Sequence, residues 1–263
     1  MAGSELPRSP FAGMIGSTAG SSPRVLSRDQ IEQVLAAHRL YVETERRQGR
    51  RADFGSADLL GVNFSGLDLR RAKMDRAVLK GADFTGAQLQ RANLIGALLP
   101  HALLDGADLS GARLSGANLM SASLRNTCLA RADMEFALVA NAVLAGACLE
   151  AADMSGAILD AAVLTRARLR AANLRGAGFR AARLDEADLR DARLGGAFLV
   201  EASLRGTDLR GAYMRLARLD GADLSGADLR STEGLTQAQF AVAHCDIDTK
   251  LPAALSRTDN GKR

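Results

Sequence analysis

The sequence predicts an all-β solenoid, in which a long middle segment winds into stacked square coils and a helical cap covers each end. The first observation is a bulky apolar residue at every fifth position from Phe54 to Leu229, which makes 36 consecutive units without an insertion. The second is an alanine two residues before nearly every one of these central residues. A period of five matches neither the helical nor the strand repeat, so the chain must turn once per unit.

Four units complete one square coil of 20 residues, and successive coils stack at the strand spacing of about 4.8 Å. The 36 units therefore predict about nine coils. The central residue and the alanine point inward, and the other three positions face solvent, where Asp, Asn, Arg, Ser and Gly dominate. Leu, Phe or Met fills every central position except Val139, and the alanine is replaced only at Val62, Leu67, Thr127 and Thr207.

The segment before the coils is expected to hold a tail and one helix. Residues 1–24 contain three of the five prolines among Gly and Ser without any periodicity, which predicts a disordered tail. Residues 25–51 are expected to cap the first coil with a helix over Ser27–Gln48, which starts with a capping box and has one apolar face. Gly49 is the expected stop signal. An open coil end needs such a cap because it exposes apolar side chains and unpaired strand edges.

A second cap is expected after the coils of residues 52–231. Residues 232–255 begin with a short helix over Thr236–His244, which again starts with a capping-box pattern. Phe240 is the expected plug over the last coil. Residues 256–263 are polar and are expected to form a frayed tail.

The repeat resembles the pentapeptide-repeat proteins, whose A(D/N)LXX pattern is seen at residues 82–84, 107–109 and 227–229. The resemblance covers about two thirds of the chain and implies a right-handed quadrilateral β-helix. A helix before the coils and the ending LTQAQF…CDIDTKLP are similar to a bacterial subset of that family. The resemblance implies the fold but not the function, because members of the family do different things.

The charge distribution argues against binding of a polyanion along the coils. The net charge is +4, but residues 52–231 carry 22 Lys and Arg against 21 Asp and Glu. The basic excess lies in residues 1–51, which have 8 basic and 5 acidic residues, whereas residues 232–263 have 4 of each. We therefore expect no direct binding of nucleic acid and no association with a membrane.

Several features favour a reduced, cytoplasmic protein. The N-terminus shows no basic segment followed by an apolar one, as a secretory signal would require. No apolar run is long enough to span a membrane. Three cysteines are too few for a disulfide framework.

An enzyme needs a concave site with convergent polar groups, and a coil interior filled with Leu, Phe, Met and Ala offers none. His38, His101 and His244 lie in separate parts of the chain. Cys128 and Cys148 hold the same position of successive coils and so stack on each other, where a disulfide is geometrically allowed but free thiols are favoured. Two thiols are too few for a zinc site. We expect no catalytic residue, no cofactor, no metal and no small-molecule substrate.

The period of 20 allows the surface to be examined column by column, with faces one to four named after Phe54, Leu59, Phe64 and Leu69. On face four, Asp before and Arg after the central residue predict a lattice of exposed ion pairs that neutralise each other. Face two is different, because the position before its central residue, which we call the bridge position, holds mostly apolar residues instead of Asp or Asn. The adjoining column of face three adds three apolar residues, and two more follow central residues of face two. We name the whole patch the apolar surface, which consists of Val78, Leu98, Leu103, Met120, Leu138, Val143, Ile158, Val163, Phe198 and Val200.

A contiguous exposed apolar patch usually marks an interface. The sequence therefore favours a non-enzymatic rod that binds a protein partner, with a homodimer as the leading use, because a two-fold contact uses one patch twice. The family resemblance implies an alternative, since some pentapeptide-repeat proteins bind DNA gyrase by resembling duplex DNA in shape and charge. Such mimicry requires a strongly acidic surface, whereas residues 52–231 are nearly neutral.

Overall fold

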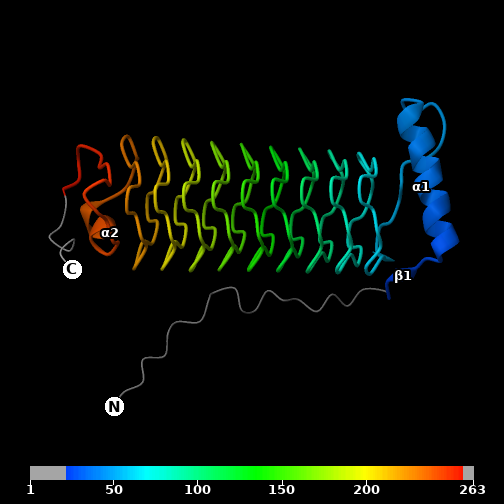
Figure 1. The fold of residues 1–263 in the computed structure, drawn as a ribbon, viewed down its shortest axis with the longest axis horizontal. Coiled ribbons are helices and arrows are strands. Elements are labelled where there is room, and N and C mark those ends of the chain that lie inside the picture. Colours follow the sequence, from blue (N-terminus) through cyan, green and yellow to red (C-terminus); the bar gives the residue numbers. More distant parts are fainter. Residues whose placement is uncertain (1–21, 257–263) are drawn as a thin grey trace, which may run out of the picture.

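The computed structural model describes residues 22–256, and Figure 1 shows a straight stack of coils with a helix at each end. The named elements are β1 (Arg24–Val25), α1 (Arg28–Glu43), β2 (Ala57–Asp58) and α2 (Gln237–Ala241). Between β2 and α2 the chain pairs through single residues, because a turn follows every central residue. Each bridge position pairs in parallel with the equivalent position of the next coil, as in Asp53 with Lys73.

Backbone hydrogen bonds join each coil to the next in a fixed pattern. The N–H of Val78 donates to the carbonyl of Ala57, and the N–H of Leu59 donates to the carbonyl of Val78, both at 2.8 Å. Within one coil, the N–H of Val62 donates to the carbonyl of Leu59 at 3.1 Å and closes the turn. The stack is therefore a continuous parallel ladder although its named strands are very short.

Every turn between residues 54 and 232 places its third residue at a positive φ, the mark of a type II turn. Of these 36 positions, 16 hold glycine and 20 hold other residues, such as Ala151 at 54° and Ala181 at 54°. A residue other than glycine in this left-handed conformation costs about 1 kcal/mol. The ladder stabilises it, since the N–H of Ala151 donates to the carbonyl of Arg170 at 2.9 Å.

The central residues and the alanines form one dry core, as the repeat predicts, and no member of this core between residues 52 and 229 is more than 2% exposed. Thr127 and Thr207 replace alanine without leaving a buried hydroxyl unpaired. Their Oγ1 atoms donate to the carbonyls of Leu104 at 2.7 Å and Leu184 at 2.9 Å. A threonine is tolerated at this inward position because a coil carbonyl lies within reach of its hydroxyl.

Helix α1 begins as predicted and ends earlier than predicted. Its capping box is confirmed, because Ser27 Oγ accepts from the N–H of Gln30 at 3.2 Å and Gln30 Oε1 accepts from the N–H of Ser27 at 2.8 Å. The predicted end at Gln48 is wrong, since α1 stops at Glu43. The next residue, Thr44, donates its hydroxyl to the carbonyl of Leu40 at 2.6 Å, and Glu45 and Arg46 then take positive φ values of 51° and 75°.

Helix α1 lies across one end of the stack (Figure 1). Ile31, Val34 and Leu35 pack against the core, and so do the partly buried Val62 and Leu67 of the first coil. Val62 and Leu67 replace the usual alanine in the coil that is covered by a helix instead of by another coil.

Gly49 is required by its position under α1. Its φ is +73°, and an added Cβ would lie 2.3 Å from the carbonyl oxygen of Ala37. No larger residue fits between the end of the loop and the helix.

The expected tail of residues 1–24 is wrong at its last residue. Arg24 and Val25 form β1, which pairs in parallel with Ala57 and Asp58 of β2. The Arg24 guanidinium also donates to the carbonyl of Asp53 at 2.6 Å. β1 therefore covers part of the first strand edge, and residues 1–21 lie outside the described residues.

The other end is a modified coil. Helix α2 has the predicted capping box between Thr236 and Gln239, although it ends at Ala241 and not at His244. Phe240 is fully buried, as expected for a plug. Beyond α2 the ladder resumes, but more than 20 residues of chain separate the paired positions. Asp223 pairs with His244, and Asp228 pairs with Lys250.

The chain after this modified coil is partly ordered. Ser256, which was expected to belong to the frayed tail, donates its N–H to Gln237 Oε1 at 3.0 Å. Residues 257–263 lie outside the described residues.

Candidate functional site

The bridges place eight of the ten residues of the apolar surface on two neighbouring faces. On face two, Val78 pairs with Leu98 and Leu138 pairs with Ile158, and Phe198 follows two coils later. On face three, Leu103 and the pair of Val143 with Val163 occupy one column. Met120 and Val200 lie in the turns that join the two faces.

The side chains of the apolar surface differ in exposure. Leu98, Leu103 and Met120 are exposed, at 43%, 46% and 39%. The other seven are half-buried. None belongs to the buried core, so all ten keep part of their side chain on the outside.

Polar residues divide the apolar surface into parts. Asn118 lies between Leu98 and Leu138 on face two, and its Oδ1 accepts from the N–H of Met120 at 3.0 Å. Ser123 lies between Leu103 and Val143 on face three. The densest part therefore spans the two coils that carry Leu138, Val143, Ile158 and Val163.

Face four has the expected ion-pair lattice. Asp188, Asp208 and Asp228 each bind the arginine two residues later, with the closest nitrogen and oxygen atoms 2.6 to 2.7 Å apart. Longer contacts join the coils, such as Arg190 with Asp208 at 3.6 Å. The hydrogen bond from Arg190 lowers the pKa of Asp188 more than burial raises it. Because every arginine of this lattice is bound to a carboxylate, the lattice offers little free positive charge.

The two cysteines of face four lie next to each other in one column of bridge positions. Cys128 pairs with Cys148 through the backbone, and both are free thiols. The Oγ of Ser110 lies 3.1 Å from the sulfur of Cys128. Cys148 is only 9% exposed, and its hydrogen bond with Arg168 raises the pKa of that guanidinium.

The structure keeps the three histidines apart. His38 lies on α1, His101 occupies a left-handed turn position with φ 59°, and His244 is in the last, modified coil. Within residues 22–256 no group of three or more His, Cys, Asp and Glu side chains could hold a metal ion. None of the described helices is both long enough and apolar enough to cross a membrane.

His38 is a buried structural residue of the N-terminal cap. It is 1% exposed, and its Nδ1 accepts from the N–H of Ala52 at 3.1 Å. Burial lowers the pKa of His38, because it disfavours the charged form. Asp68 acts against this shift, whereas Arg70 and Arg51 add to it.

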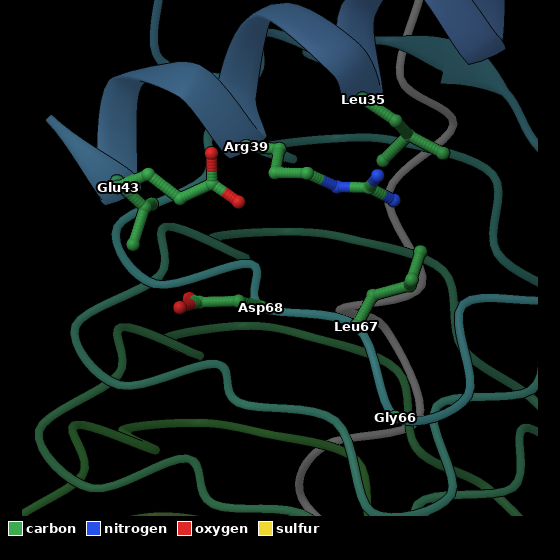
Figure 2. Close-up of a pocket in the computed structure, with 7 residues that line it drawn as sticks. Leu35, Arg39, Glu43, Gly66, Leu67 and Asp68 are labelled. Atoms are coloured by element: carbon green, nitrogen blue, oxygen red, sulfur yellow. The ribbon is translucent and has the colours of Figure 1, made fainter.

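Two concave features of the described residues lie where α1 meets the first coils. One of them is a cavity of about 310 Å³. Figure 2 shows that Leu35, Arg39 and Glu43 of α1 face Leu67 and Asp68 of the first coil there. A second depression, beside it, is lined by arginines that the sequence interpretation did not single out. The sequence could have indicated this group of arginines, because Arg71 and Arg91 hold the same position of successive coils and follow the basic N-terminal segment.

Comparisons with known proteins agree with this architecture. The model of a family described as pentapeptide repeats (8 copies) matches residues 50–86, 87–126, 117–160, 162–199 and 199–232. None of the curated proteins that were compared with the chain matches it.

Solved structures with similar folds are also pentapeptide repeat proteins. The chain is 26% identical to HetL, which is involved in heterocyst differentiation regulation in the cyanobacterium Nostoc sp. strain PCC 7120, with 81% of this chain and 95% of HetL covered and a TM-score of 0.43. It is 21% identical to trypsin-treated QnrB1, a plasmid-mediated fluoroquinolone resistance protein, with 74% and 92% covered and a TM-score of 0.50. A protein from the Arabidopsis thaliana thylakoid lumen is 26% identical, with 47% and 81% covered and a TM-score of 0.39.

Proposed function

Because this chain belongs to the pentapeptide-repeat family, whose members form right-handed quadrilateral β-helices, we propose that it is a non-enzymatic rod that binds a protein partner. The rod has nine regular coils between residues 52 and 231, with α1 and α2 as caps, and its binding site is the apolar surface. The partner is a second copy of the same chain.

The observation that carries this proposal is the residue type at the bridge positions of face two. The same position on face four holds Asp188, Asp208 and Asp228, each bound to an arginine. On face two, the pair of Leu138 and Ile158 replaces such polar residues without adding to the core. Apolar side chains that do not stabilise the interior and remain partly accessible are explained by an external contact.

A second copy suits the geometry of this surface. The ladder holds the apolar side chains in straight columns, so two rods can place the same columns against each other about a two-fold axis. The half-buried side chains of Leu138, Val143, Ile158 and Val163 lie in the densest part and would form the centre of such a contact. Leu98, Leu103 and Met120 are more exposed and would extend it along the rod.

The experiment compares the mass of the full chain in solution with that of a variant in which Leu138→Asp and Ile158→Asp are combined. A matched control combines Phe136→Asp and Leu216→Asp, which removes two exposed apolar side chains, at 59% and 72% exposure, outside the apolar surface. We expect light scattering to report a dimer for the wild type and the control and a monomer for the surface variant. The melting temperatures of all three should be similar.

Two results would contradict the proposal. A wild type that is monomeric at tens of micromolar excludes self-association through this surface. A surface variant that unfolds instead of dissociating would place Leu138 and Ile158 in the interior.

A further inference from the structure

A second concave surface shares Val42 with the cavity described above and lies where the end of α1 meets the turns of face four. It has a volume of about 610 Å³, and we name it the arginine depression. The end of α1, the chain after it and the turns of the first two coils contribute its lining, which consists of Tyr41, Val42, Glu45, Arg46, Arg70, Arg71, Gln90 and Arg91.

The charge of the arginine depression is strongly unbalanced. Four guanidinium groups line it, against the single carboxylate of Glu45. Arg70 is already bound to Asp68, with the closest atoms 2.6 Å apart. The other three arginines form no ion pair with any residue between 22 and 256. Three arginines that share one concave surface without a carboxylate partner are a site for a multiply charged anion.

Most of the carbonyl groups at the end of α1 already accept hydrogen bonds. The carbonyl of Leu40 accepts from the N–H of Thr44 at 3.0 Å, and that of Tyr41 accepts from the N–H of Arg46 at 2.7 Å. The carbonyl of Val42 accepts from the N–H of Glu45 at 3.2 Å. These bonds engage three of the last four carbonyls of the helix and so reduce the partial negative charge that would face the ligand.

A neutral polar atom also lacks a partner in the lining. Gln90 donates its Nε2 to Asp108 Oδ2 at 2.7 Å, which orients the amide. Its Oε1 is buried and accepts no hydrogen bond from the described residues. This amide is therefore held by its Nε2 and presents no accessible acceptor to a ligand.

We propose that the arginine depression binds the phosphate group of a small organic ligand, with Arg46, Arg71 and Arg91 as the residues that bind phosphate. Arginine matches the tetrahedral oxygens of phosphate through paired N–H donors. The volume of about 610 Å³ lies within the range of small-molecule sites. This proposal concerns a different surface from the apolar surface and does not depend on dimerisation.

A small ligand fits better than a nucleic acid, because the positive charge does not continue along the rod. In the turn column that holds Arg71 and Arg91, the next coil has Gly111. The later part of face four consists of arginines bound to aspartates. A long polyanion would therefore meet a neutral surface beyond the second coil, whereas one phosphate group needs only the local arginines.

The test measures binding of ribose 5-phosphate, ribose and inorganic phosphate to the full chain by isothermal titration calorimetry. The test variant combines Arg71→Ser and Arg91→Ser, and the matched control combines Arg76→Ser and Arg131→Ser. All four arginines occupy the same left-handed turn position, which serine already fills at Ser56 and Ser121, so folding should be unaffected. Circular dichroism and melting temperature check this for both variants.

We expect saturable binding of ribose 5-phosphate to the wild type and the control, with no binding of ribose. The test variant should lose at least about tenfold in affinity. Vesicles of phosphatidylcholine with and without phosphatidic acid form a further arm. Binding to the acidic vesicles that is lost in the test variant, without binding of soluble phosphates, identifies a lipid headgroup as the source of the phosphate.

Three results overturn the proposal. One is that neither soluble phosphates nor acidic vesicles bind to the wild type. Another is that the control loses as much affinity as the test variant, since this indicates a non-specific effect of total charge. The third, from a parallel titration with duplex DNA, is binding of DNA without binding of ribose 5-phosphate, because the ligand would then be a polyanion and not a small phosphate.

Discussion

At the scale of single residues, the turn position decides how much strain the chain carries. Twenty residues other than glycine adopt a positive φ between residues 54 and 232, although an L residue is disfavoured there. The strain is repeated in almost every coil, and the ladder of backbone hydrogen bonds offsets it. Substitution to glycine should therefore stabilise the protein at these positions and destabilise it at neighbouring ones.

We predict that Ala151→Gly combined with Ala181→Gly raises the free energy of unfolding by about 1 kcal/mol, because the relief of strain exceeds the entropy cost of glycine. The measurement is urea denaturation followed by circular dichroism. The control combines Ala130→Gly and Ala145→Gly, which lie one position earlier in their turns and have no positive φ. It should be destabilised by about 1–2 kcal/mol, and a gain in stability there would contradict the explanation.

The contrast between inward and outward positions gives a second prediction. Leu144 is fully buried, so Leu144→Asp places an unpaired charge in a dry column and should abolish cooperative folding. Arg190 lies on the surface and is bound to Asp188, so Arg190→Ala should cost about 0–1 kcal/mol. Thermal melts of both variants test this, and equal losses would refute the assignment of inward and outward positions.

At the scale of elements, α1 and the end of the first coil depend on each other. His38 couples this contact to pH, since it is buried as the neutral form with its Nδ1 bound to the N–H of Ala52. Its folded-state pKa is lowered from the usual value of 6.5. The unfolded chain therefore binds a proton more readily, and folding stability falls as the pH drops below about 6.5.

We predict that the melting temperature of the wild type decreases between about pH 6.5 and pH 5 and that His38→Asn reduces this decrease. Asparagine retains an acceptor near the position of Nδ1 but does not titrate in this range. His101→Asn serves as the control because His101 lies in an exposed turn, and it should keep the wild-type profile. Identical profiles for all three proteins would exclude His38 as the titrating group.

The capping role of α1 can be tested without removing it. Ile31→Asp combined with Val34→Asp alters the face of the helix that packs against the core. We expect it to expose the first coil and to cause concentration-dependent association, measured by analytical ultracentrifugation. Gln33→Asp combined with Ala36→Asp changes exposed positions of the same helix and should leave sedimentation unchanged.

At the scale of the whole molecule, the fold is a sum of equal layers. Deletion of residues 112–131 removes one complete coil and leaves every later residue on its original face. The deletion also removes Asn118 and Ser123, so Leu98 would meet Leu138 and Leu103 would meet Val143. We predict a folded protein with a continuous apolar surface and tighter self-association, measured by light scattering over a dilution series.

The matched control is a slightly shorter deletion, of residues 112–129 only. It removes nearly the same residues but breaks the five-residue frame. The residues after the deletion are then out of register with the coils before it, so their apolar side chains no longer stack on the core of those coils. We expect loss of the cooperative melt. If both deletions behave alike, the frame is not what determines the fold.

The sequence was most informative where the repeat is regular. Three features follow from residues that are only a few positions apart in the sequence. They are the inward and outward positions, both capping boxes and the ion pair of Arg190 with Asp188. Three features depend on tertiary contacts and could not be predicted in this way. β1 is very short, the end of α1 is determined by a side-chain bond from Thr44, and the last coil is enlarged by α2.

The sequence predicted which residues of the candidate site share a column, but it did not predict how exposed they are or where the surface is concave. The period of 20 places Leu98 and Leu138 on one face, whereas their degree of exposure depends on neighbouring side chains in three dimensions. The arginine depression was missed for a related reason. Arg46 and Arg91 are distant in sequence, and they line one surface only because the chain folds back after α1.

The direction of the backbone hydrogen bonds has a mechanical consequence. They join each coil to the next and run along the rod, so a force that pulls the two ends apart loads them one coil at a time. Each coil that detaches releases about 20 residues, which extend to about 60–70 Å after subtraction of the original layer spacing. Under tension the rod should therefore lengthen in equal steps, with α1 and α2 as the places where unwinding must begin.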